Sequence, residues 1–203
     1  MNKNIIILFA LKKEANSLLN QSILKFKSYS KNEFFCEYNN YNITVLITGI
    51  GNKSKNDPRI INLNNNNLLI KAGTCAILDD NIPILTPIIP QFVGFDKKII
   101  KLELSFPDSK VQNRVKLLVI NKGLITVKKP LLNKKKGQEY LNKNFAACDM
   151  ETFYLIEKYK NIPFIPLLVG TDRGDKKSII SFIKSLSKAS EILRDEIIKI
   201  IKK

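Results

Sequence analysis

The sequence predicts an α/β fold, in which buried strands alternate with helices, and three observations lead to it. A continuous apolar run at residues 4–9 is typical of a central strand covered on both faces, and helical spacing follows it directly. Nearer the other end, a helix-like run at 152–159 leads into an apolar strand-like run at 164–169. Residues 176–203 have the periodicity of one long amphipathic helix. We expect residues 1–203 to form a single domain.

The charge of the chain is strongly positive, with 34 Lys and Arg against 18 Asp and Glu. Such an excess can indicate nucleic-acid binding. Nearly all of it is Lys, however, whereas phosphate-reading surfaces favour the Arg fork. We therefore interpret the excess as compositional and do not expect a nucleic-acid partner. The lysine-rich stretch at 128–143 predicts a surface loop and helix near the mouth of a site, with a contact surface for an anionic partner as the alternative.

The residue types that are rare in the chain exclude several kinds of chemistry. The absence of His excludes histidine general bases and histidine metal ligands. Cys36, Cys75 and Cys148 are too widely spaced for a zinc pattern and odd in number, which suits a reducing, cytoplasmic setting. The first apolar run is too short to span a membrane and lacks a signal-peptide pattern. We expect no membrane contact, no metal and no cofactor.

The first third of the chain predicts a strand, a helix and a hairpin. Leu11, Ala15 and Leu18 have helical spacing directly after the first strand, which places Glu14 in the first turns of a helix. Glu14 is then either a solvated position near the positive end of the helix dipole or a functional acid. Strands at 33–38 and 41–48 are predicted to pair through an Asn-Asn turn.

The middle of the chain is less regular. A helix is expected within 52–67, with a loop over the asparagine tract at its end. Residues 68–72 predict a strand that runs into Gly73 and Thr74, a pair that either binds a ligand or makes a plain turn. Further strands are predicted at 84–89, 99–106 and 123–127, the first at a sheet edge because of its prolines, and 111–120 can be either strand or helix.

The C-terminal helix is predicted to close the domain by burying one apolar stripe. The stripe comprises Ile179, Ile180, Phe182, Ile183, Leu186, Ala189, Ile192, Leu193, Ile197, Ile198 and Ile201.

Five short motifs then follow one another in a fixed order: Ala10-Leu11-Lys12-Lys13-Glu14, Thr48-Gly49-Ile50-Gly51-Asn52-Lys53, Gly73-Thr74-Cys75-Ala76-Ile77-Leu78, Met150-Glu151, and Thr171-Asp172 with Asp175 beyond it. This ordered set resembles the nucleoside phosphorylase/hydrolase superfamily. Within it, the chain is most similar to the methylthioadenosine/S-adenosylhomocysteine nucleosidases and the futalosine hydrolases. The resemblance implies a three-layer α/β/α sandwich with a central, mixed and twisted sheet, and it implies a homodimer in which the partner closes the substrate pocket.

The resemblance also implies a role for each acidic residue. Asp172 would protonate or hydrogen-bond N7 of a purine, which makes the base a better leaving group. Glu151 would grip the ribose hydroxyls, and Glu14 would hold and deprotonate the attacking water. Breaking an N-glycosidic bond passes through an oxocarbenium-like sugar, for which one protonated and one ionised carboxyl group are suited. Desolvation by its apolar neighbours is expected to raise the pKa of Asp172.

The remaining roles are supporting ones. Met150 would pack on the sugar, Thr74 and Thr171 would support the site by hydrogen bonds, and Leu131 would take over base stacking. These assignments predict a purine nucleosidase that hydrolyses 5′-methylthioadenosine, S-adenosylhomocysteine or a related nucleoside.

Two alternatives remain open. A phosphate-dependent phosphorylase would need an anion site near the first strand, where no Arg precedes Arg59. A catalytically degenerate nucleoside binder is the second alternative, because residues 73–76 and 126–131 depart from the family pattern.

Overall fold

The structure is a computed structural model that describes residues 3–51, 57–60, 67–104, 106 and 109–202. The helix predicted within 52–67 lies largely outside the described residues, and so do Asn52 and Lys53 of the second motif. Pro58–Ile60, which is described, forms a short 3₁₀ turn.

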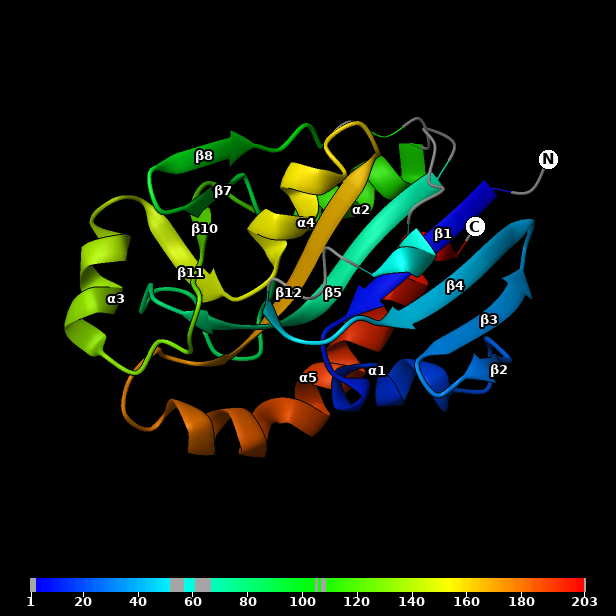
Figure 1. Cartoon of the computed structure of the whole chain (residues 1–203), viewed down its shortest axis with the longest axis horizontal. Helices are drawn as coiled ribbons and strands as arrows, with labels where there is room; N and C mark the ends of the chain where they lie inside the picture. The colour runs from blue at the N-terminus through cyan, green and yellow to red at the C-terminus, as the bar shows by residue number, and fades with distance from the viewer. Residues whose placement is uncertain (1–2, 52–56, 61–66, 105, 107–108, 203) are drawn as a thin grey trace.

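The described strands are β1 (Lys3–Phe9), β2 (Lys27–Ser30), β3 (Glu33–Tyr38), β4 (Tyr41–Ile47), β5 (Asn67–Ile77), β6 (Pro87–Pro90), β7 (Phe92–Phe95), β8 (Lys98–Lys101), β9 (Val119–Ile120), β10 (Gly123–Thr126), β11 (Phe145–Asp149) and β12 (Phe164–Asp172). The described helices are α1 (Lys12–Leu19), α2 (Ser109–Leu118), α3 (Lys134–Leu141), α4 (Thr152–Lys158) and α5 (Ser178–Ile201). They build a mixed sheet in the order β2-β3-β4-β1-β5-β11-β10-β7-β8, with β12 pairing β5 and β6 (Figure 1).

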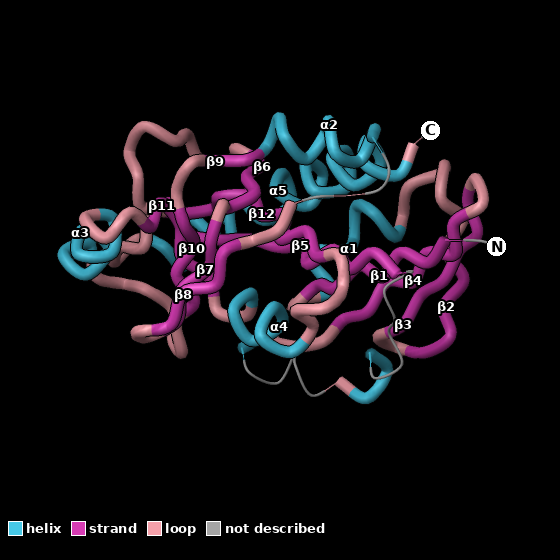
Figure 2. The backbone as a smooth tube through the Cα atoms, turned by 90° about the horizontal axis from the view of Figure 1, so that it is seen from above, coloured by secondary structure: helices cyan, strands magenta, loops and turns pink. Residues whose placement is uncertain are grey.

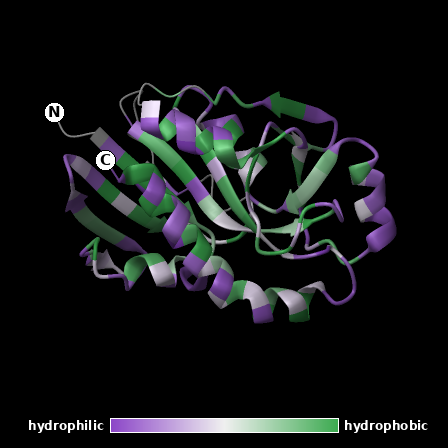
Figure 3. Cartoon of the chain, turned by 180° about the vertical axis from the view of Figure 1, so that it is seen from behind, coloured by the Kyte–Doolittle hydropathy of each residue, from purple (hydrophilic) through white to green (hydrophobic). Residues whose placement is uncertain are grey.

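Helices cover both faces of this sheet. Figure 2 shows α1, α2 and α5 on one face and α4 on the other. One apolar cluster joins the first face to α1, α2 and α5 through residues such as Leu18, Val115 and Leu193. A second cluster packs Phe153 and Leu155 of α4 against the opposite face. Figure 3 shows the central strands as mainly hydrophobic and α3 as mainly hydrophilic. The predicted three-layer sandwich is therefore confirmed.

Strand β5 organises the sheet because it changes neighbours along its length. Residues 67–71 pair with β1 in parallel, and residues 69–76 pair with β12 on the other side. Only Ala76 and Ile77 pair with β11, which takes the side that β1 has left. Between these two pairings the edge of β5 around Gly73 and Thr74 pairs with none of the described strands on that side. A gap of this kind leaves backbone donors available to side chains.

Several element predictions are confirmed. The apolar runs at 4–9 and 164–169 are β1 and β12, and the helical spacing after β1 is α1. The hairpin joins β3 to β4 through Asn39 and Asn40, both with positive φ, as a tight turn of this type requires.

Two strand predictions are wrong in part, and one open alternative is resolved. The strand expected at 84–89 is β6, which begins only at Pro87, because the chain turns at Leu85 with φ +67°. The strand expected at 99–106 is β8, which ends at Lys101. The ambiguous segment at 111–120 is the helix α2 followed by the two-residue strand β9.

The stripe predicted for the C-terminal helix is buried only in its later turns. Ala189, Leu193 and Ile197 are fully buried in the first cluster. By contrast, Ile179, Ile180 and Ile183 are 55%, 60% and 67% exposed, so their predicted burial is wrong. The reason is geometric: the first turns of α5 extend away from the sheet (Figure 1). No helix in the described part of the chain is long and apolar enough to cross a membrane.

Candidate active site

A pocket of about 250 Å³ opens where the sheet divides. Its walls come from the segments that follow β1 and β11, from the middle of β5, from the end of β12 and from the start of α5. All seven residues predicted from the sequence line it: Glu14, Thr74, Leu131, Met150, Glu151, Thr171 and Asp172. The volume is slightly below the range usual for drug-sized ligands, and it suits a small molecule.

Glu14 lies in the first turn of α1 and is 3% exposed, so it is not a solvated surface position. Its Oε1 accepts the backbone N–H of Thr74 at 2.9 Å and the Thr74 hydroxyl at 2.7 Å. Its Oε2 accepts the backbone N–H of Leu11 at 3.0 Å. The Thr74 N–H lies in the stretch of β5 that has no partner among the described strands on this side, so it is available to Glu14. Three donors thus fix the Glu14 carboxylate at the pocket wall.

Glu151 occupies the N-cap position of α4 and is buried. Its Oε1 accepts the backbone N–H of Gly51 at 2.9 Å, and Gly51 has φ +72°, a conformation that favours glycine. Burial raises the pKa of Glu151 to about 7, in spite of the nearby Lys71 ammonium, which lowers it. Glu151 can therefore change its charge near neutral pH.

Asp172 is the last residue of β12 rather than part of the following loop. The register of β12 against β5 shifts between Gly170 and Asp172. Asp172 Oδ1 accepts the N–H of Gly174 at 2.9 Å, and Oδ2 accepts the Thr171 hydroxyl at 3.1 Å. Burial raises the pKa of Asp172, as the sequence predicted, although hydrogen bonds from Gly174, Ser178 and Thr171 act in the opposite direction. A carboxyl group of this kind holds its proton to a higher pH than a solvated aspartate.

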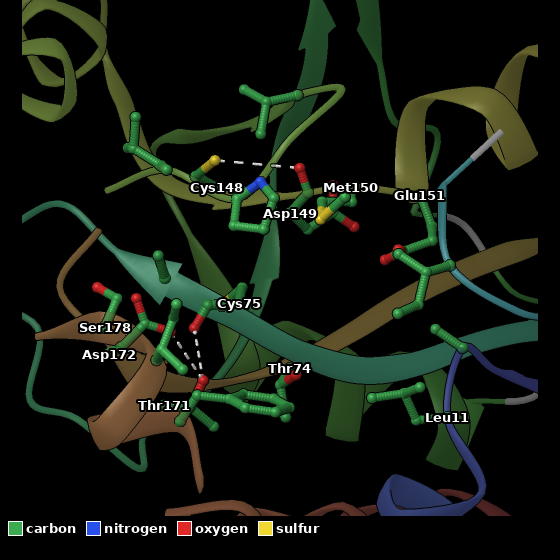
Figure 4. A pocket seen from close by; sticks show the side chains of 18 of the residues that line it. Leu11, Thr74, Cys75, Cys148, Asp149, Met150, Glu151, Thr171, Asp172 and Ser178 are labelled. Carbon is green, nitrogen blue, oxygen red and sulfur yellow. Dashed lines mark hydrogen bonds between the residues drawn. The ribbon is translucent and has the colours of Figure 1, made fainter. Parts of the chain in front are cut away.

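The acids approach the pocket from different ends. Figure 4 shows Asp172 and Ser178 at one end and Glu151 with Leu11 at the other. Thr171 lies beneath Cys75, whose carbonyl accepts the Thr171 hydroxyl at 3.3 Å. Between the two ends, the pocket is lined mainly by apolar side chains. The pocket can therefore bind an elongated molecule, with Asp172 at one end of it and Glu151 at the other.

Leu131 borders the pocket next to a tight turn of the chain. A Cβ added at Gly174, which has φ +66°, would meet Leu131 Cδ2 at 2.9 Å. The turn after Asp172 favours glycine for its backbone conformation, and a side chain at this position would also displace Leu131. This contact couples the loop that follows Asp172 to the wall that carries Leu131.

Sequence reasoning missed two charged residues at this site. Asp149 lines the pocket and accepts the Thr126 hydroxyl at 2.7 Å and the N–H of Thr152 at 3.0 Å. Lys71 is 2% exposed and forms ion pairs with two pocket-lining acids, Asp149 and Glu151. Asp149 could have been found as a second acid two residues before Glu151. Lys71 had a signal too, as a lone cation within an otherwise apolar predicted strand.

Among the described residues, no group of three or more Cys, Asp or Glu side chains is arranged to hold a metal ion. The thiols of Cys75 and Cys148 are buried, and burial raises the pKa of both, so neither is an activated nucleophile. The chemistry that the pocket offers is therefore that of its carboxyl groups.

The chain resembles known proteins in its three-dimensional structure. No protein-family model matches the chain, and no curated protein does so either. Among solved structures, a futalosine hydrolase mutant of Helicobacter pylori aligns with a TM-score of 0.78 and 15% identity over 98% of both chains. A mutant methylthioadenosine nucleosidase (MTAN) of the same species, with 5′-methylthioadenosine in its active site, aligns with a TM-score of 0.79 and 15% identity over 99% of both chains.

A third structure, the MTAN of Chlamydia trachomatis bound to MTA, aligns with a TM-score of 0.78 and 18% identity over 97% of this chain and 96% of the other. The fold is thus that of the nucleoside phosphorylase/hydrolase proteins, as the sequence resemblance implied. At such low identity the likeness shows the fold, and a shared fold does not by itself carry a shared activity.

Proposed function

We propose that the pocket hydrolyses the N-glycosidic bond of a purine nucleoside, with 5′-methylthioadenosine, S-adenosylhomocysteine or a related nucleoside as the substrate. One observation carries the proposal: Asp172, a half-buried acid with a raised pKa, lies at one end of the pocket, and Glu151 lies at the other with Glu14 on the same lining. The nucleosidases among the structural relatives support the same substrate class.

At the base end, the proposed role of Asp172 is to donate a proton or hydrogen bond to N7 of the purine. As the glycosidic bond breaks, its electron pair moves into the base, and the donor at N7 stabilises the charge that develops there. The raised pKa of Asp172 supports this role, because an acid must still carry its proton when the substrate binds.

At the sugar end, the proposed roles belong to Glu151 and Glu14. Glu151 accepts hydrogen bonds from the ribose hydroxyls. Glu14 accepts a proton from a water molecule while the oxygen of that water bonds to the oxocarbenium-like anomeric carbon. The donors from Thr74 and Leu11 keep the Glu14 carboxylate in one orientation, which favours attack from a single direction.

The two alternatives differ from this proposal in chemistry. A phosphorylase would place a phosphate dianion where Glu14 lies, and among the described pocket-lining residues there is neither Lys nor Arg to hold it. A catalytically degenerate binder would keep the pocket without the reaction. Cys75 and Ala76, which depart from the small residues of the family pattern, both line the pocket and are the feature that favours this alternative.

Incubation with a panel of purine nucleosides, with and without phosphate, distinguishes the hydrolase from the phosphorylase and from the degenerate binder. We expect free base to appear in phosphate-free buffer, at a rate that phosphate does not change. Release that depends on phosphate would indicate a phosphorylase. Saturable binding of nucleoside without release would indicate the degenerate binder.

We further propose a homodimer in which the second copy covers the mouth of the pocket. The rim is apolar and open: Ile50, Leu132 and Ile179 line the pocket, yet each is at least 40% exposed. Ile180 and Ile183 continue this surface along the first turns of α5. A contiguous exposed apolar surface beside a pocket is typical of an interface.

Replacing Ile180 and Ile183 together with Asp is expected to convert the dimer to a monomer, because buried unpaired carboxylates would oppose association. Sedimentation velocity measures the change. Leu117→Asp is the matched control, since Leu117 is 74% exposed on α2 and should leave the assembly intact. A wild-type protein that sediments as a monomer at all concentrations would contradict the proposal.

A further inference from the structure

A buried lysine lies beside the acids that line the pocket, and none of the steps proposed above uses it. Lys71 is in the middle of β5, on the face that carries Leu69 and Cys75 of the second apolar cluster. It is 2% exposed. Lysine is almost never fully buried unless its charge is paired, so the surroundings of its ammonium group indicate what it does.

Three carboxylates surround this ammonium group. Lys71 Nζ lies 3.4 Å from Asp149 Oδ2 and 3.8 Å from Glu151 Oε2. Glu14 approaches the same place, because a Cβ added at Gly73 would lie 2.9 Å from Lys71 Nζ and 3.3 Å from Glu14 Oε1. The missing side chain of Gly73 thus provides the space in which the cation and the acids meet. The acids come from α1, from the end of β11 and from the start of α4.

The cluster holds more acid than base. Burial opposes a charge on Lys71, but Asp149, Glu151 and Glu14, together with the Cys75 thiol, raise its pKa above the ordinary value. At Glu151, burial raises the pKa most, Asp149 and Glu14 raise it further, and Lys71 and the Gly51 N–H lower it. The phenol of Tyr154 also lies near Asp149 and Glu151, and burial raises its pKa. Among the described residues, Lys71 is therefore a cation that opposes protonation of Glu151.

Of the two ion-pair partners of Lys71, Glu151 has fewer other groups that hold its carboxylate. Asp149 is held by hydrogen bonds from Thr126 and from both the N–H and the hydroxyl of Thr152. Glu151 Oε1 accepts the N–H of Gly51, whereas Oε2 is the oxygen nearest Lys71. The ammonium group thus acts on the Glu151 oxygen that the Gly51 amide does not hold.

We propose that Lys71 is a positioning residue of this pocket, whose buried ammonium keeps the Glu151 carboxylate ionised and directed toward the sugar hydroxyls of a bound nucleoside. The sugar-binding part of this inference rests on the proposed function. The electrostatic part concerns Lys71 and Glu151 alone and can be measured without a substrate.

Carbon-13 NMR of carboxyl-labelled glutamate, with Glu151→Gln for assignment, follows the titration of Glu151 directly. In the Lys71→Met variant, which keeps the length of the side chain and removes its charge, we expect the midpoint for Glu151 to rise by about one pH unit or more. In Lys71→Met combined with Asp149→Asn, the loss of one neighbouring negative charge should move the midpoint back toward that of the wild type. Unchanged titration of Glu151 in a folded Lys71→Met protein would overturn the proposal.

Thermal unfolding across pH tests the same inference should Lys71→Met fold poorly at neutral pH. Without the lysine, the folded pKa of Glu151 lies further above its unfolded value, so stability present at low pH is lost as pH rises through that folded pKa. We expect the melting temperature of Lys71→Met to fall increasingly below that of the wild type from about pH 5 to pH 8. This difference should be smaller in the double variant. A deficit of the same size at every pH would mean that Lys71 only fills space, and would overturn the proposal.

Nucleoside kinetics then separate this inference from the proposed function. In Lys71→Met we expect KM for the nucleoside to rise at neutral pH and to recover as pH increases, because ionised Glu151 is the form that accepts sugar hydroxyls. A wild type that releases no base would refute the hydrolase proposal, while the NMR titration would still decide the role of Lys71.

Discussion

Replacing Asp172 with Asn is expected to lower kcat for base release by about 10²–10⁴-fold, the usual contribution of a general acid. The amide cannot donate a proton to N7, although it can still accept the N–H of Gly174 and can donate to the Thr171 hydroxyl oxygen. KM should change little, because the shape of the pocket is kept. Steady-state release of adenine from 5′-methylthioadenosine, followed for both proteins, measures the effect.

The fold should survive this change. Because burial raises the folded pKa of Asp172 above its unfolded value, its contribution to stability is present at low pH and is lost as pH rises through the folded pKa. Asp172→Asn should therefore leave the melting temperature unchanged at low pH and unchanged or higher at pH 8. The wild-type rate should also fall as pH rises through this pKa, since the protonated acid is the active form. A variant with wild-type kcat would contradict the role of Asp172.

Replacing Glu14 with Gln is expected to lower kcat by a similar factor of about 10²–10⁴, because an amide cannot accept a proton from water. The change also affects the fold. The amide oxygen can take the place of only one carboxylate oxygen, so the amide nitrogen faces either the donors of Thr74 or the N–H of Leu11. One buried donor left unsatisfied costs about 1–3 kcal/mol.

Kinetics and denaturant unfolding together distinguish these two effects. Thr74→Val serves as the matched control, since it removes the hydroxyl bond to Glu14 but keeps both the carboxylate and the backbone bond. We expect Thr74→Val to lose stability with a much smaller loss of kcat than Glu14→Gln. Equal losses of kcat in the two variants would mean that Glu14 acts only by supporting the wall of the pocket.

The fold could be predicted well from the sequence because its signals are local. The apolar runs of β1 and β12, the spacing of Leu11, Ala15 and Leu18, and the Asn39-Asn40 turn each determine an element from neighbouring residues alone. The errors arose where contacts between distant parts of the chain determine the length of an element or the burial of its residues. The turn at Leu85 shortens a predicted strand, and the first turns of α5 extend beyond the sheet, so apolar residues with helical periodicity remain exposed.

The pocket was only partly predictable. The motif order brought together six residues that all line it, and Leu131, from the segment 126–131, lines it as well, although their roles stay predictions. What the sequence did not reveal is how they are held. The division of the sheet at β5 exposes the Thr74 N–H to Glu14, and Gly73 leaves room for Lys71 among the acids. Both depend on contacts between residues far apart in the chain, for which no periodicity gives a signal.

A crystal structure of the Asp172→Asn protein with 5′-methylthioadenosine bound tests most directly whether these acids meet around one nucleoside. We expect the side chain at position 172 within hydrogen-bonding distance of N7, Glu151 on the ribose hydroxyls, and a water molecule between Glu14 and the anomeric carbon. A nucleoside bound in this pocket with its sugar away from Glu14 and Glu151, or bound elsewhere on the protein, would contradict the proposed hydrolysis.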